Sequence, residues 1–279
     1  MKLEQVFQAW GNWNPGKPKV LEKLGGLSNQ SYLVESLVGS LVESPVESEL
    51  FVVRLNRESK NLGVSRHREK EILIAIKGLY FSPDISFWGS DYLVTKFVVS
   101  NTKKSPELKM IADLFLQIHR VDYSNQIVMN PLEQLSLYYH QINSPDQRLK
   151  TCYEAIANQD IASDPNDFCL CHHDLLPENI IQSNERVIVI DWEYAQYGDP
   201  LFDLAIYAES MNLDQAQTDS FISAYNDGYE KNLNITSLRK FRLISALINL
   251  LWWKIEKPEK DISPGLLSLE NRIFLTGLI

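Results

Sequence analysis

The sequence predicts an α+β protein in which strands come first and helices follow. Residues 51–55 form a short run rich in valine and leucine, which is the pattern of a buried strand. Residues 106–121 instead repeat apolar side chains at intervals of three and four, which is the pattern of an amphipathic helix. A polar segment at residues 171–194 gathers histidine, aspartate, asparagine and glutamate around a β-branched run. We therefore expect an antiparallel-sheet N-terminal lobe, a mainly helical C-terminal lobe, and a functional site at that polar segment.

The chain has 279 residues, enough for one large domain or two lobes. The formal charge of −9 disfavours a general role in nucleic-acid binding and agrees with a cationic substrate. No run of apolar residues is long enough to span a membrane, and residues 1–5 lack the apolar core of a signal peptide. We expect a cytoplasmic protein without membrane insertion.

The three cysteines, Cys152, Cys169 and Cys171, fit a protein kept in a reducing compartment. Cys169 and Cys171 flank Leu170 on an expected strand, and this arrangement disfavours a metal site there.

The first elements of the chain are expected to be a short helix and an irregular lead-in within residues 1–20. A glycine-rich turn follows, in which Gly25, Gly26, Ser28 and Asn29 precede a strand. Glycines let a backbone approach a phosphate closely, and serine and asparagine add hydrogen-bond donors. The alternative for this turn is an ordinary hairpin.

The rest of the N-terminal part is expected to complete the sheet and add one helix. Valine and aromatic residues favour the strands, and a charged start with an apolar continuation favours a helix packed on the sheet. The expected elements are a hairpin connection over residues 36–50, a strand over 51–55, a helix over 66–76, and strands over 85–89 and 91–99.

The C-terminal part is expected to be helical. Pro106 fits the first turn of the helix over residues 106–121, and His119 on its apolar face is expected to be structural. Further helices are expected over residues 132–142, 146–159, 214–229 and 237–255.

The polar segment carries the chemistry. Asp174 and Asn179 lie on a loop, and the β-branched run at residues 187–190 predicts a buried strand that ends at Asp191. An amide and a carboxylate can hold a divalent metal on a polyphosphate, while another carboxylate orients and deprotonates a hydroxyl group. These roles point to Asn179 and Asp191 as metal ligands and to Asp174 as the base. The alternative is an ordinary acidic loop beside a strand.

The pattern H-x-D-x-x-x-x-N at residues 172–179, followed by I-D-W-E-Y, resembles the catalytic segment of the aminoglycoside phosphotransferase and choline kinase superfamily. The resemblance implies a protein-kinase-like bilobal fold and transfer of the γ-phosphoryl group of ATP, with Mg²⁺, to the hydroxyl of a small molecule. It makes Asp174 the catalytic base, Asn179 and Asp191 metal ligands, and His172 a structural residue of the loop.

The N-terminal part also resembles this superfamily. The turn G-G-L-S-N is similar to the nucleotide loop of choline kinases, so the resemblance assigns Gly25, Gly26, Ser28 and Asn29 to nucleotide binding. Arg54 takes the position at which most kinases carry a phosphate-binding lysine. An arginine can serve there as a permanent cation with a planar fork of donors.

Two further nucleotide contacts follow from the resemblance. The family pairs the phosphate-binding cation with a glutamate from the next helix, for which Glu69 is our choice and Glu71 the alternative. Backbone groups around Lys96, Phe97 and Val98, where the family has its hinge between lobes, would bind adenine. The resemblance thus implies a nucleotide-binding lobe over residues 1–97 and a catalytic and substrate-binding lobe over residues 98–279.

The segment G-D-P-L-F-D-L-A resembles the family's segment whose last aspartate braces the catalytic loop, which gives Asp203 a structural role. Choline kinases enclose a quaternary ammonium group in aromatic rings, a surrounding that suits a cation without hydrogen-bond donors. Tyr194 matches one ring of such an enclosure by its place in the motif, and Trp252 or Trp253 matches another. Adjacent tryptophans point to different helix faces, so at most one should line a given pocket. Glu193 and Glu209 are the acidic candidates for substrate binding.

The resemblance implies choline, ethanolamine or a related amino alcohol as the first candidate substrate. Thiamine is the second, because bacterial thiamine kinases look similar in the same segments, and an aminoglycoside is the third. A pseudokinase that binds nucleotide without chemistry is a different class of protein, and the presence of Asp174, Asn179 and Asp191 argues against it.

Overall fold

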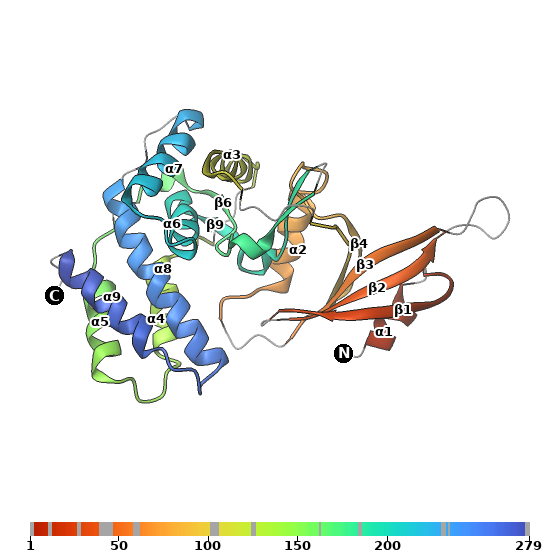
Figure 1. Ribbon diagram of the computed structural model, residues 1–279, viewed down its shortest axis with the longest axis horizontal. Coiled ribbons are helices and arrows are strands. Elements are labelled where there is room, and N and C mark those ends of the chain that lie inside the picture. Colours follow the sequence, from red (N-terminus) through yellow and green to blue (C-terminus); the bar gives the residue numbers. More distant parts are fainter. Residues whose placement is uncertain are drawn as a thin grey trace. The chain divides into compact units, whose positions relative to one another are not determined.

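The structure is a computed structural model in which the chain forms two compact units (Figure 1). It describes residues 3–10, 13–26, 29–38, 47–57, 62–100, 106–123, 127–161, 163–183, 186–229, 233 and 235–276. Unit 1 comprises Met1–Lys60, Lys77–Thr102 and Ile181–Ile190, and unit 2 comprises Asn61–Ile76, Lys103–Ile180 and Asp191–Ile279.

Unit 1 is built on a five-stranded antiparallel sheet with strand order β1-β2-β3-β5-β4. Its strands are β1 (Asn14–Leu24), β2 (Gln30–Val38), β3 (Glu47–Leu55), β4 (Ile85–Trp88) and β5 (Tyr92–Lys96). Strand β3 is the middle strand and pairs with β2 in one unbroken register from Gln30–Leu55 to Val38–Glu47. The strand expected over residues 51–55 is therefore present as part of β3. Of the hairpin connection expected over residues 36–50, residues 36–38 and 47–50 instead belong to the strands, and residues 39–46 lie outside the described residues.

One face of this sheet carries the core of unit 1. Helix α1 (Leu3–Ala9) contributes Val6, which packs with Trp10 and with Phe51 and Val53 of β3. The ring of Trp10 lies 5.2 Å from that of Phe51, edge to face. Because side chains alternate along a strand, Arg54 lies on the face opposite to this core.

Strand β1 replaces the irregular lead-in that was expected from Pro15 and Pro18. Proline lacks a backbone N–H and is tolerated on edge strands and at bulges. Strand β1 is at the edge of the sheet, and its pairing with β2 shifts register between Asn14 and Lys19 and again between Val20 and Glu22. The prolines therefore fit the strand because of its edge position, which the sequence alone does not reveal.

Unit 2 holds most of the helices among the described residues (Figure 1). They are α2 (Arg66–Ala75), α3 (Leu108–His119), α4 (Pro131–Tyr139), α5 (Gln147–Ala157), α6 (Pro200–Ser210), α7 (Gln215–Gly228), α8 (Ile235–Glu256) and α9 (Ser263–Leu275). Helix α6 is buried along most of its length, and the ring of its Tyr207 packs against Phe115 of α3 and Phe221 of α7. The five C-terminal helices expected from the sequence are present, and α6 and α9 are additional.

The compact units do not follow the single boundary expected after residue 97. Helix α2 joins unit 2 because Arg68 donates to the carbonyl of Ala195 at 2.9 Å. The segment Ile181–Ile190 joins unit 1 because the Val189 N–H donates to the carbonyl of Phe81 at 2.9 Å and Arg186 pairs with Asp84. The assignment of the two parts to nucleotide binding and to catalysis stays a prediction.

Two short strand pairs frame the polar segment of the sequence. Strand β6 (Cys169–Cys171) pairs antiparallel with β9 (Gln196–Gly198), and β7 (Ile180–Gln182) pairs with β8 (Val187–Val189).

None of the helices formed by the described residues is long and apolar enough to span a membrane. The three cysteines are free thiols.

Candidate active site

The loop that follows β6 is held by a buried aspartate from α6. Asp203 is fully buried, and its two carboxylate oxygens accept the backbone N–H groups of His172 at 2.7 Å and His173 at 2.6 Å. His173 has a φ of +58°, a left-handed conformation that costs free energy for a residue with a side chain. The two short hydrogen bonds to Asp203 stabilise this conformation. Asp203 thus occupies the bracing position expected for it.

Histidines surround the same carboxylate. His119 Nε2 lies 3.2 Å from Asp203 Oδ2, and the fully buried ring of His172 packs against Trp192 at 4.7 Å. Burial would raise the pKa of Asp203, but the hydrogen bond with His119 and the nearby histidines lower it to about 2. Asp203 is therefore ionised at neutral pH, and the surrounding groups serve to hold the loop.

The central pair of the site is Asp174 and Asn179. The η2 turn (Pro177–Asn179) brings the Asn179 amide back onto Asp174, where Nδ2 donates to the Asp174 carbonyl at 2.7 Å and to Oδ2 at 3.1 Å. Because the amide nitrogen faces Asp174, the Asn179 oxygen Oδ1 is the atom that a metal ion would take. The two hydrogen bonds thus close a ring that contains the four residues between Asp174 and Asn179.

Negative charge is concentrated around Asp174. Burial, and then the charges of Asp191 and Glu193, raise the pKa of Asp174 well above its usual range. Asp191 has a φ of +65° at the start of the η3 turn (Trp192–Tyr194), a second left-handed residue in the same site. Carboxylates crowded in this way are stabilised by a cation, and the oxygen donors of Asn179 and Asp191 suit Mg²⁺.

An arginine from α2 bridges two buried glutamates. Arg66 Nη1 lies 2.6 Å from Glu193 Oε2 and 2.9 Å from Glu69 Oε2. The side chains of Glu193 and Glu69 are only 1% and 4% exposed, and Arg66 offsets the charge of both buried carboxylates. Glu71 is half exposed and lies near His67 instead. Pairing of Glu69 with Arg54 stays a prediction.

The η3 turn also places Tyr194 against α8. Trp252 Nε1 donates to the Tyr194 hydroxyl at 3.2 Å, whereas the ring of Trp253 is faced by Lys260 Nζ at 3.2 Å from its centroid. Of the two tryptophans, Trp252 is therefore the one associated with the D-W-E-Y turn. Burial raises the pKa of the Tyr194 phenol, which stays protonated.

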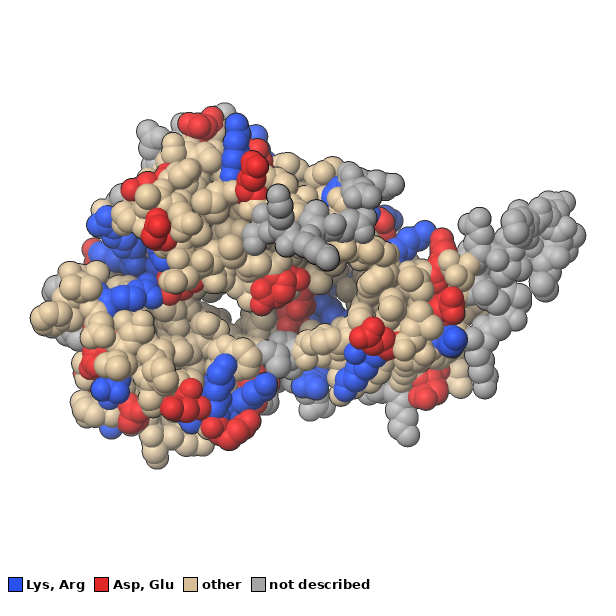
Figure 2. All heavy atoms as spheres, in the orientation of Figure 1, with Lys and Arg blue, Asp and Glu red and all other residues tan. Residues whose placement is uncertain are grey.

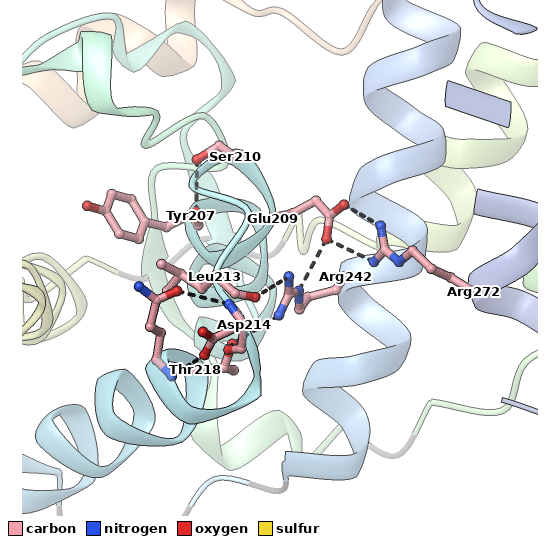
Figure 3. A network of polar contacts seen from close by, with 9 residues as sticks. Tyr207, Glu209, Ser210, Leu213, Asp214, Thr218, Arg242 and Arg272 are labelled. Carbon is pink, nitrogen blue, oxygen red and sulfur yellow. Dashed lines mark hydrogen bonds and ion pairs between the residues drawn. The ribbon is translucent and has the colours of Figure 1, made fainter. Parts of the chain in front are cut away.

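Glu209 does not present an unbalanced charge. It lies near the end of α6, and Figure 3 shows it held by Arg242 of α8 and Arg272 of α9. Its Oε1 is 2.5 Å from Arg272 Nη1, and its Oε2 is 3.2 Å from Arg242 Nε. Two guanidinium groups offset the charge of Glu209, so the structure favours a role in joining helices over a role in binding a cationic substrate.

The expected phosphate turn has one clear structural requirement. Gly26 has a φ of +144°, a conformation that side chains other than glycine rarely adopt, whereas a Cβ on Gly25 would meet no neighbour within 4 Å. Asn29 is buried, and its Oδ1 accepts the N–H of Arg57 at 3.4 Å. Ser28 lies outside the described residues. The nucleotide contacts of this turn stay predictions.

Arg54 and the hinge also make contacts within unit 1. Arg54 Nε donates to Asn56 Oδ1 at 3.1 Å. The backbone N–H of Lys96 donates to the Asp84 carbonyl at 2.8 Å, and that of Phe97 donates to the Leu50 carbonyl at 2.9 Å. An adenine contact would therefore use the carbonyl groups of these residues or the backbone of Val98.

Sequence reasoning missed three contributors. Arg66 and Arg68 both lie in a run of mixed charges, and the sequence does not indicate which groups either arginine contacts. Tyr138 of α4 donates its hydroxyl to the carbonyl of Leu62 at 3.0 Å and contacts Tyr194. The apolar spacing of α4 gave no indication of that role, because Tyr138 reads as an ordinary core residue.

The fold and the site define the class of this protein as a small-molecule kinase with a protein-kinase-like architecture. Residues 107–243 match the family model described as "Phosphotransferase enzyme family". The chain thus carries a domain of that family, and the match includes Asp174, Asn179, Asp191 and Asp203.

Relatives with similar sequences and solved structures with the same fold are also known. Protein LicA of Haemophilus influenzae is 23% identical over 260 residues, which cover 85% of this chain and 73% of the relative. A LicA homolog of Metamycoplasma hominis is 44% identical over 82 residues, or 29% of this chain and 31% of the relative. The crystal structure of choline kinase LicA from Streptococcus pneumoniae has a TM-score of 0.71 at 21% identity, covering 93% of this chain and 94% of that one. At this identity the comparison shows that the fold is shared.

Proposed function

We propose that this protein transfers the γ-phosphoryl group of ATP to the hydroxyl group of a small cationic alcohol, with choline or ethanolamine as the first candidates. The observation that carries the proposal is the ring formed by Asp174 and Asn179 beside Asp191, on a loop braced by Asp203. A carboxylate fixed in this way is suited to orienting an alcohol and accepting its proton.

The metal requirement of the reaction follows from the same residues. Asn179 and Asp191 would hold Mg²⁺, which when bound neutralises charge on the phosphates. Burial, and then the charges of Asp191 and Glu193, raise the pKa of Asp174, and a bound cation would favour its carboxylate form. Asn179 has the further role of fixing the Asp174 carboxylate through its amide nitrogen.

Nucleotide binding is assigned to residues of unit 1. Gly25, Gly26, Ser28 and Asn29 would approach the phosphates, Arg54 would pair with them, and Lys96 to Val98 would contact adenine through backbone groups. A structure described as "LicA in complex with AMP" shares the fold with a TM-score of 0.71 at 20% identity, covering 99% of this chain and 97% of that one. Consumption of ATP and the three free cysteines are both in keeping with a cytoplasmic protein.

The choice of a cationic alcohol rests on aromatic residues and on the relatives. Tyr194 and Trp252 are joined through the Trp252 indole N–H, and their rings offer π faces that attract a quaternary ammonium group. Glu193 is nearby in the chain but is neutralised by Arg66, so the rings rather than an ion pair would recognise the cation. The solved relative named as a choline kinase supports choline over thiamine.

The test is the release of ADP from Mg²⁺–ATP with choline, ethanolamine, thiamine and kanamycin in parallel. The proposal expects a large increase with choline or ethanolamine and little with kanamycin. An increase with thiamine alone would keep the reaction and replace the substrate. Bound nucleotide without turnover on any alcohol of the panel would instead favour the pseudokinase.

A further inference from the structure

Side chains that can bind a soft metal ion gather at β6, the strand that leads into the catalytic loop. Cys169 and Cys171 are two residues apart on a strand, so their side chains project to the same side. Their Sγ atoms are 3.9 Å apart. Two sulfur ligands on one tetrahedral zinc ion are about 3.8 Å apart, given Zn–S distances of about 2.3 Å. The strand thus presents the thiols at the separation that such an ion requires.

A third ligand comes from α3. A ring nitrogen of His119 and the two Sγ atoms all lie within 4.8 Å of one another. His119 and Cys171 are buried, whereas Cys169 is partly exposed and offers a path by which an ion could enter. The sequence disfavoured a metal site here because it showed two cysteines on a strand and gave no sign that a histidine 50 residues away joins them.

The surroundings of His119 match those of a metal-ligating histidine. Nε2 lies 3.2 Å from Asp203 Oδ2, and a carboxylate on one ring nitrogen fixes the ring so that the other nitrogen can face a metal. That other nitrogen, Nδ1, lies 2.8 Å from the Tyr225 hydroxyl, which would move aside when an ion binds.

We propose that Cys169, Cys171 and His119 form a binding site for a soft divalent metal ion, with Zn²⁺ as the natural occupant. Binding forms two metal–sulfur bonds and one metal–nitrogen bond; each thiol releases one proton to the buffer, and the imidazole binds in its neutral form. The fourth tetrahedral position is left to a ligand from outside this set. Asp203 contacts His119 and also holds the backbone of His172 and His173. An ion bound to His119 would therefore make the catalytic loop more rigid through Asp203.

The test is a titration of the whole chain with Cd²⁺ in a buffer containing excess Mg²⁺, which occupies sites built from oxygen ligands. Ultraviolet absorption from thiolate-to-cadmium charge transfer is expected to rise and saturate at about one equivalent, and Zn²⁺ is expected to displace the Cd²⁺. Cys152, a buried thiol on α5 outside the cluster, offers the matched control. Cys152→Ser is expected to bind like the wild type, whereas Cys169→Ser and Cys171→Ser are each expected to weaken binding by at least about tenfold.

Absence of the absorption in the wild type, or equal binding by wild type and Cys169→Ser, would overturn the proposal. If the serine variants fail to fold, alkylation of the wild type decides the question. Zn²⁺ is expected to slow the labelling of Cys169 in the native protein, as measured by peptide mass spectrometry. Labelling at the same rate with and without Zn²⁺ would rule the site out. Neither readout depends on kinase activity.

Discussion

Asp203 shows how one buried charge can organise a catalytic loop. An isolated carboxylate would be strongly disfavoured in the interior, but this one accepts two backbone N–H groups and lies beside His119. Those contacts hold His173 in its left-handed conformation and so fix the direction of the chain that enters Asp174. The role of Asp203 is therefore to position the loop, through atoms that do not themselves react.

Asp203→Asn is expected to lower the free energy of unfolding by on the order of 3 kcal/mol, because it removes the charge that His119 and the two N–H groups stabilise. Thermal unfolding followed by circular dichroism measures this. Asp227→Asn, at an exposed position of α7, is the control and should change stability by less than about 0.5 kcal/mol. Equal stability of the two variants would contradict the assigned role.

The lowered pKa of Asp203 predicts that the stability of the fold depends on pH. The folded-state pKa of Asp203 is about 2, below the value of about 3.9 expected in the unfolded chain. The stability that this carboxylate contributes is thus present above about pH 4 and is lost as the pH falls towards 2. We expect Asp203→Asn to lose that part of the acid-unfolding slope. A wild type and a variant with parallel stability profiles between pH 4 and 2 would show that the lowered pKa is absent.

The sequence predicts which candidate residues the loop brings together, but it does not predict the residues that support the loop. Asp174, Asn179 and Asp191 stand at fixed spacings within one short segment, so a pattern can reveal them. Arg66 and Tyr138 reach the site from α2 and α4, and their contacts depend on packing between distant segments. Nothing local to either residue distinguishes it from a surface charge or a core aromatic.

At the scale of elements, α2 and the η3 turn are connected by side chains of the helix. Arg66 ties them through Glu193, and Arg68 adds a hydrogen bond to the Ala195 carbonyl. Tyr138 and Gln134 of α4 hold the segment that leads into α2, since both donate to the carbonyl of Leu62, four residues before the helix begins. The position of the turn that begins at Asp191 therefore depends on a helix whose sequence reads only as charged.

Arg66→Ala is expected to destabilise the fold by about 3 kcal/mol, because it leaves Glu193 and Glu69 buried without this cation. His67→Ala is the matched control on the same helix, since the His67 side chain is 85% exposed. Chemical denaturation of both variants measures the difference. A loss in Arg66→Ala no larger than in His67→Ala would show that the bridge contributes little.

The two tryptophans of α8 provide a test of substrate recognition. If the alcohol is cationic, Trp252→Ala should raise its KM by about tenfold, which is the size of a strong cation–π contribution. Trp253→Ala should change KM less than twofold, because lysine side chains already face its ring. Steady-state kinetics with choline measures both effects. The reverse order would move the substrate contact to Trp253.

Elements with strong local signals were predictable, and those that depend on neighbours were not. The valine-rich strand β3 and the amphipathic helix α3 follow from the period of their side chains. Strand β1 was missed because its prolines argue against a strand until its edge position is known. Glu209 seemed a candidate for a substrate contact because Arg242 and Arg272, which neutralise it, come from helices far along the chain.

At the scale of the whole molecule, charge is spread rather than concentrated. The chain carries a formal charge of −9, and on the face shown in Figure 2 the described acidic and basic side chains are interspersed. The functional negative charge is instead buried in unit 2, around Asp174. A small cation or a metal ion would be drawn to that interior cluster by short-range contacts more than by the field of the surface.

Removal of divalent metal should therefore affect both activity and stability. Chelation with EDTA is expected to abolish phosphoryl transfer, and added Mg²⁺ should restore it. Mg²⁺ with ADP should raise the midpoint of thermal unfolding in proportion to the logarithm of ligand concentration. Asp191→Asn should greatly reduce that increase, as differential scanning fluorimetry would show. An undiminished increase in this variant would remove Asp191 from the metal site.

The central claim is that Asp174 is the base in phosphoryl transfer from ATP to an alcohol. The most direct test of this claim measures the transfer of the radiolabelled phosphoryl group from [γ-³²P]ATP to choline or ethanolamine by the wild type and by Asp174→Asn. We expect labelled phosphoester from the wild type and a rate lower by about a thousandfold in the variant, with nucleotide binding retained. Labelled product formed at similar rates by both proteins would contradict the assignment of Asp174, and no labelled product from the wild type would contradict the proposed substrates.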